Sequence, residues 1–186
     1  MSNSSPDSVS PETDADLLAK LISTLEESDF IRREKRAKRI IWLSQHNLRP
    51  GVVVGPVDTM GMLSEAHDCF AEGLFIAALL LAVSFIEHTL FDELYERGMV
   101  KYGDSLTSTI KSARSNNVFP SAMLDRTDHL REIRNPFAHR KGPEHAQALG
   151  SRYIAQMAHP TTVLEADAKE ALVLMYEYFR ATLKEM

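Results

Sequence analysis

The hydrophobic pattern of the chain centres on one long apolar run. Residues 74–86 are apolar except for Ser84, charged residues then appear as far as Arg97, and Gly98 follows. A helix that is apolar on every face is normally enclosed by other helices, and glycine commonly ends a helix. The run is shorter than the roughly 20 residues of a membrane span. We therefore predict a helix over 74–97 at the centre of a bundle, with no membrane association.

Apolar residues recur at helical spacing in the rest of the chain as well. The first such stripe, from Leu17 to Leu25, predicts an amphipathic helix that continues to about His46. Further helices are predicted over about 60–72, 104–115 and 121–133, a partial helix over 144–157, and a final helix over 163–184. The expected fold class is all-α.

Composition changes along the chain suggest three parts. Residues 1–12 are rich in Ser, Pro and Asp without large apolar groups, which is typical of a disordered tail. Residues 47–57 contain two prolines and two glycines, which is typical of a connector. We therefore predict a tail over 1–12, a helical extension with its linker over 13–57, and a helical bundle over 58–186.

The overall composition narrows the class of protein. Hydrophobic residues make up 44% and charged residues 25%, and Cys69 is the single cysteine, a usage that favours a reducing, cytoplasmic location. The net charge of −5 is not typical of a nucleic-acid-binding domain, which usually carries net positive charge. One basic stretch, residues 31–40, is either a phosphate-contacting arm or a solvated helix face paired with the acidic residues before it.

The densest group of chemically useful residues is the segment 134–140, Arg-Asn-Pro-Phe-Ala-His-Arg. Arginine stays protonated and can grip two phosphate oxygens, while histidine titrates near neutrality and can move protons. Asn135 precedes Pro136 and is therefore biased away from helical backbone, so the helix is expected to end or kink there and to bring Arg134 and His139 together. The plainer alternatives are a structural salt bridge for Arg134 and a helix cap for His139.

One carboxylate in the central helix requires a partner. Glu87 falls on the row of Leu80, Val83, Phe91 and Leu94, and an unpaired charge is costly on an apolar row. It is either a rim glutamate held by any nearby Lys or Arg, or the anchor of Arg134.

The basic residues next to the motif could supply a local patch that the net charge of the whole chain does not. These residues are Arg131, Arg140 and Lys141. In contrast, the spacing of His67, His88 and His129 matches no metal-ligand pattern, and no nucleotide-loop motif is present. We therefore predict neither a metal nor a cofactor.

The spacing Arg134-x4-His139, with Asn135 directly after the arginine, resembles the Rx4-6H motif of HEPN domains (higher eukaryotes and prokaryotes nucleotide-binding). The upstream residues 65–78 and the tetrad 85–88, Phe-Ile-Glu-His, also resemble the paired helices that open many bacterial HEPN proteins. The resemblance covers about 58–184. It implies an up-and-down bundle of four or five helices that forms a homodimer, with Arg134, Asn135 and His139 of both subunits lining one cleft.

The resemblance also implies two functions of different classes. Catalytic HEPN proteins are metal-independent endoribonucleases, common in toxin–antitoxin and phage-defence systems, so RNA and an antitoxin are the expected partners. Other members have lost activity and bind nucleotide, RNA or a protein partner. One subgroup carries a tyrosine two residues after the histidine as the target of a nucleotidyltransferase. That position is Lys141 here, and this partnership is not expected.

Overall fold

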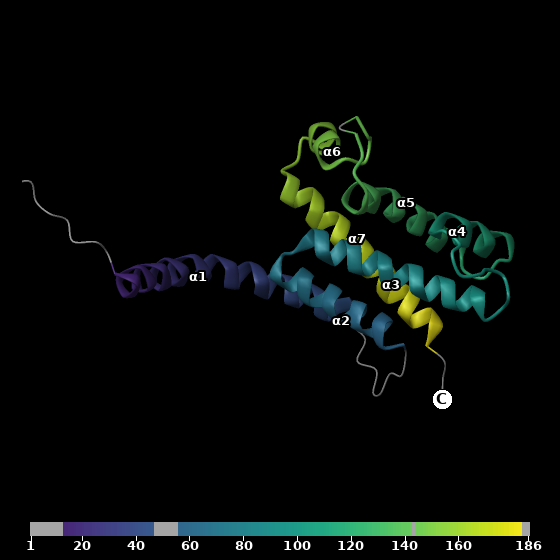
Figure 1. The fold of residues 1–186 in the computed structure, drawn as a ribbon, viewed down its shortest axis with the longest axis horizontal. Coiled ribbons are helices and arrows are strands. Elements are labelled where there is room, and N and C mark those ends of the chain that lie inside the picture. The colour runs from purple at the N-terminus through teal and green to yellow at the C-terminus, as the bar shows by residue number, and fades with distance from the viewer. Residues whose placement is uncertain (1–12, 47–55, 143, 184–186) are drawn as a thin grey trace, which may run out of the picture. The chain divides into compact units, whose positions relative to one another are not determined.

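The described part of the protein is helical throughout. A computed structural model describes residues 13–46, 56–142 and 144–183, and these contain no strand (Figure 1). The predicted tail and most of the predicted linker lie outside the described residues. The helices are α1 (Asp14–His46), α2 (Val57–Glu72), α3 (Phe75–Tyr95), α4 (Leu106–Ser115), α5 (Ser121–Ala138), α6 (Leu149–Gln156) and α7 (Pro160–Thr182). The predicted all-α class is confirmed.

The chain forms two compact units, Met1–Lys38 and Arg39–Met186. In the first unit, the large apolar side chains of α1 from Leu17 to Ile31 are all exposed. Two of its basic side chains pair along the helix, Arg33 with Asp29 at 3.6 Å and Lys38 with Glu34 at 2.6 Å. Both pairs join exposed side chains within one helix, and such pairs are local and weak. They agree with the interpretation of the basic stretch as a solvated helix face.

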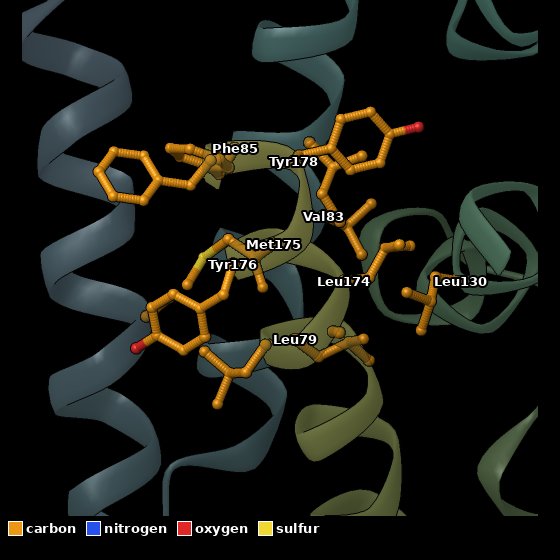
Figure 2. Close-up of a cluster of buried hydrophobic side chains, with 14 of the residues drawn as sticks. Leu79, Val83, Phe85, Leu130, Leu174, Met175, Tyr176 and Tyr178 are labelled. Atoms are coloured by element: carbon orange, nitrogen blue, oxygen red, sulfur yellow. The ribbon is translucent and has the colours of Figure 1, made fainter. Parts of the chain in front are cut away.

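The second unit is built around α3, as its apolar run predicts. Helices α2, α4, α5 and α7 all contact α3, and the C-terminal end of α1 adds the fully buried Leu43 to the same core. Figure 2 shows the core between these helices, with Leu79 and Val83 of α3, Leu174 and Met175 of α7, and Leu130 of α5 among its side chains. The burial of these side chains is the main driving force that holds the unit together.

The C-terminal ends of α2 and α3 are each followed by a glycine with positive φ. Gly73 ends α2 in the left-handed conformation at φ 83°, and its N–H donates to the carbonyl of Phe70 at 3.0 Å. The helix α3 ends at Tyr95, slightly before the predicted Arg97. Gly98 follows at φ 68°, with its N–H on the carbonyl of Tyr95 at 2.9 Å. Glycine adopts this backbone without steric strain, which explains why the chain turns at these points.

Among the described helices, α3 is the one whose length and apolar composition would allow it to cross a membrane. Half of its most apolar stretch is buried inside the protein. Its buried residues face the four neighbouring helices of the same unit. The same composition is expected of a helix at the centre of a soluble bundle.

The last helix brings two tyrosine side chains into the core. Tyr176 is 2% exposed and Tyr178 is fully buried, with its hydroxyl 2.9 Å from the hydroxyl of Thr127 on α5. Burial raises the pKa of both phenols to about 12, because the charged phenolate is poorly solvated there.

This burial predicts a loss of stability at alkaline pH. An unfolded tyrosine titrates near pH 10, whereas the folded protein keeps these two protons up to about pH 12. Their contribution is therefore complete below about pH 10 and is lost as the pH rises through about 12. The free energy of unfolding should fall there by up to about 1.4 kcal/mol per pH unit for each tyrosine. Urea unfolding followed by circular dichroism at several pH values measures this slope.

The matched variants are Tyr178→Phe and Tyr102→Phe, because Tyr102 is 78% exposed. Phenylalanine at 178 should make the alkaline slope shallower, and phenylalanine at 102 should leave it unchanged. Identical slopes in the two variants would contradict the assignment.

Candidate functional site

The motif segment lies at the C-terminal end of α5. Of the two predicted alternatives at Asn135, a helix end or a kink, the helix end is wrong, because α5 continues through Pro136 to Ala138. A proline lacks the N–H that would bond to the preceding turn, yet the N–H of His139 still donates to the carbonyl of Asn135 at 2.8 Å. Phe137 also packs against the core.

Arg134 is joined to the central helix. Its Nη2 donates to Oε2 of Glu87 at 2.8 Å, and the side chains are 16% and 36% exposed, respectively. The predicted contact between Glu87 and Arg134 is therefore confirmed. The guanidinium Nε is buried and has no hydrogen-bond partner among the described residues. The arginine is thus held by one side of its fork, and part of its hydrogen-bonding capacity is unused.

His139 has a different environment from Arg134. It is the C-cap of α5, with extended backbone at φ −137° and ψ 131°, and its side chain is exposed. Within the described part of the chain, its ring makes no hydrogen bond or ion pair, and none joins it to Arg134. That the two side chains come together therefore stays a prediction, since no hydrogen bond between described residues joins them.

Asn135 packs back along the helix toward Arg131. With its amide nitrogen turned to the carbonyl of Arg131 the two atoms lie 3.1 Å apart, and the amide oxygen then accepts from Nη1 of Arg131 at 3.3 Å. This orientation is assigned from the hydrogen-bonding groups around the amide. Asn135 therefore supports the helix surface beside the motif, and its side-chain amide forms no described hydrogen bond with the His139 ring.

The three predicted RNA-contacting residues divide into two groups. Arg131 is 19% exposed and is paired with Asp128 at 2.8 Å and Glu132 at 3.4 Å. Arg140 and Lys141 follow His139 directly, are exposed, and form no ion pair with another described residue. The positive charge that is available to an anion near the motif therefore comes mainly from Arg140 and Lys141.

The histidines considered for a metal site stay apart. His67 contacts its neighbour Asp68 at 3.1 Å, while His88 and His129 are exposed. Over the described ranges, no group of three His, Cys, Asp or Glu side chains could hold a metal ion.

Two further arginine–carboxylate pairs did not emerge from the sequence pattern. Arg126 of α5 donates from Nη1 to both carboxylate oxygens of Glu177 on α7, at 2.9 and 2.7 Å. Arg152 of α6 makes two parallel bonds to Asp167 of α7, at 2.6 and 2.5 Å. Asp167 lies one turn from the buried Val163 and Ala171. A carboxylate on an apolar row is the same signal that singled out Glu87, so it could have been found.

Comparisons with known proteins give no relative for this chain. No family model, no curated protein and no solved structure matches it. The chemistry of the site therefore follows from its residues alone. They provide a partly buried, anchored arginine, an exposed histidine five residues later, and two exposed cations directly after that histidine. This combination suits the binding of a phosphate near a proton-transfer group.

The Glu87–Arg134 contact predicts an asymmetric loss of stability. Replacing Glu87→Gln leaves a mostly buried guanidinium without its counter-charge, and we expect the free energy of unfolding to fall by about 1–3 kcal/mol. Glu165 is a matched control, because it is 34% exposed and pairs with Lys169 at 2.7 Å within one helix. Glu165→Gln should change stability by less than about 0.5 kcal/mol. Urea unfolding of both variants measures the difference, and equal effects would contradict the role of Glu87 as an anchor.

Proposed function

We propose that the protein is a metal-independent endoribonuclease of the HEPN type. The observation that carries the proposal is the 2.8 Å contact between Glu87 and Arg134. It supports a defined position for the arginine of the Arg134-x4-His139 motif, on the same helix end that presents His139. An arginine that is held in place can stabilise the negative charge of a phosphate transition state without reorganising during the reaction.

RNA carries its own nucleophile, so the chemistry demands few protein groups. A base removes the proton of the 2′-hydroxyl, and the new bond from the 2′-oxygen to phosphorus forms as the bond from phosphorus to the 5′-oxygen breaks. An acid then delivers a proton to the 5′-oxygen. The products are a 2′,3′-cyclic phosphate and a 5′-hydroxyl. His139 is the proposed proton-transfer group, and Arg134 is the proposed phosphate clamp.

A symmetric homodimer would complete this inventory. The reaction needs two proton transfers, and one motif contains a single histidine. Two-fold symmetry would place two copies of Arg134 and His139 around one cleft, because the second chain supplies the second set of residues. In this arrangement Arg140 and Lys141 would guide the RNA backbone, with Asn135 and Arg131 as the helix surface beneath them. The natural setting that we propose is a cytoplasmic toxin or phage-defence effector, restrained by an antitoxin or another protein partner.

The second candidate is a non-catalytic HEPN-like module that binds nucleotide, RNA or a protein. The observation in its favour is that Arg134 is only 16% exposed and is already paired with a carboxylate. Such an arginine can serve a structural role, and the exposed Arg140 and Lys141 would then bind an anion by charge alone. The two candidates differ in whether purified protein cuts RNA in the presence of EDTA.

The cleavage experiment uses His139→Ala beside a histidine control. The wild-type protein should cut RNA in EDTA, and the fragments should carry 2′,3′-cyclic phosphate and 5′-hydroxyl ends. The His139→Ala variant should lose about 10²–10⁴-fold in rate, the usual effect of removing one acid–base group. His129→Ala is the control, since His129 is exposed on the same helix, and it should retain activity. Full activity of a folded His139→Ala variant would reject the catalytic proposal.

The arginine is tested in the same assay. Arg134→Ala should weaken both RNA affinity and the cleavage rate, because it removes the clamp. Arg126→Ala is the matched control, since Arg126 is also a partly buried arginine of α5 in a glutamate pair. It should reduce stability without a comparable loss of activity. Equal activity losses at matched stability would point to a structural role for both arginines.

The dimer is tested by mass and by dilution. Light scattering after size exclusion should give twice the chain mass of 20.9 kDa at concentrations where the protein is active. Activity per chain should fall on dilution as the dimer dissociates, because each half-site then lacks one proton-transfer group. A monomer with undiminished activity would reject the composite site and leave a single-subunit site.

A further inference from the structure

The segment that carries His139, Arg140 and Lys141 connects α5 to α6. Its start is fixed by the last turn of α5, where the N–H of His139 is bonded to Asn135. Its end is the first residue of α6, Leu149. The position of the segment therefore depends on how firmly α6 is held against the rest of the unit.

The helix α6 has little hydrophobic anchorage. None of its residues is buried, and Tyr153 and Ile154 are exposed. It lies against the N-terminal part of α7, where the chain returns from α5 (Figure 1). A short helix without buried side chains gains little stability from packing, so polar contacts must contribute much of what keeps it in place.

The Arg152–Asp167 pair is the strong polar contact at this junction. The two side chains are 11% and 5% exposed, and the guanidinium faces both carboxylate oxygens at 2.6 and 2.5 Å. A bidentate pair of this kind fixes orientation as well as distance, and its dry environment makes the loss of either partner expensive.

Three backbone hydrogen bonds connect described residues from Gly142 to α6. The N–H of His145 donates to the carbonyl of Gly142 at 3.1 Å, the N–H of Ala148 to the carbonyl of His145 at 2.8 Å, and the N–H of Arg152 to the carbonyl of Ala148 at 3.1 Å. The N–H of Gln147 also donates to Nδ1 of His145 at 3.2 Å. These bonds connect α6 to Gly142, which lies three residues after His139.

We propose that Arg152 is a positioning residue for the candidate site. It acts through Asp167, α6 and the backbone hydrogen bonds of Gly142, His145 and Ala148 on the exposed residues 139–141. The claim rests on the proposed ribonuclease function for its catalytic consequence. Arg152 itself is not proposed to touch RNA, because its guanidinium is occupied by Asp167.

The test compares Arg152→Gln and Arg152→Lys in the full chain. Lysine keeps the charge but loses the bidentate fork, so its effects should be intermediate. Arg126→Gln is the control, because the Arg126–Glu177 pair joins α5 to α7 without involving α6. Hydrogen exchange of the protein without RNA should accelerate by at least about tenfold within 142–156 in Arg152→Gln, with α3 unchanged. In Arg126→Gln this segment should not be singled out.

The activity measurement separates positioning from simple destabilisation. Arg152→Gln should lower kcat by about 10–100-fold while KM changes by less than about threefold, because a displaced proton-transfer group affects the transition state more than binding. A uniform increase in exchange, unchanged exchange, or a mobilised segment with unchanged kcat would each overturn the proposal. If the wild-type protein cuts no RNA, the proposed ribonuclease function is rejected. The hydrogen-exchange measurement within 142–156 still decides, independently of activity, whether Arg152 holds the segment in place. If Arg152→Gln does not fold, the Arg152→Lys comparison carries the test.

Discussion

The enclosure of α3 is the constraint on which the rest of the second unit depends. Its buried residues, among them Ala78, Val83, Leu90 and Leu94, face helices on several sides. Hydrophobic burial of this kind draws helices together but does not specify their rotation, since it has no direction. Wherever a charged side chain enters such surroundings, it needs a partner in a defined place. The polar contacts at the edge of the core therefore set the orientations that the apolar contacts leave open.

Three arginine–carboxylate pairs at the edge of the core carry out this orienting role across helices, and a fourth, Arg114 of α4 with Asp125 of α5, is more exposed. Arg134 joins α5 to α3, Arg126 joins α5 to α7, and Arg152 joins α6 to α7. In two of the three, the arginine lies on α5, so the helix that bears the motif is fixed against both α3 and α7. The pairs differ in their surroundings: Arg152 and Asp167 are nearly dry, whereas Arg126 and Glu177 are about one-third exposed. Salt should weaken the exposed pair more than the buried one.

The candidate site combines an inner and an outer component. Arg134 lies at the edge of the core and is held by Glu87, while His139 lies at the exposed end of the same helix. This division suits a site that is completed by another molecule, whether RNA or a second copy of the chain. The catalytic and the binding interpretations therefore require different things of the Arg134 guanidinium. Catalysis needs the unused side of its guanidinium to reach a phosphate, whereas a binding module needs only the salt bridge.

The sequence by itself determined the elements whose signals are local or periodic. The apolar run defined α3, Gly73 and Gly98 marked the ends of α2 and α3, and the apolar row around Glu87 showed that this carboxylate requires a partner. The tertiary structure decided what depends on distant neighbours. The helix α5 continues past Pro136 with Phe137 packed against the core, Glu177 of α7 pairs with Arg126 of α5, and Asp167 of α7 pairs with Arg152 of α6. Local preferences such as the residue before a proline are worth only a few kcal/mol, and contacts between segments far apart in the chain can outweigh them.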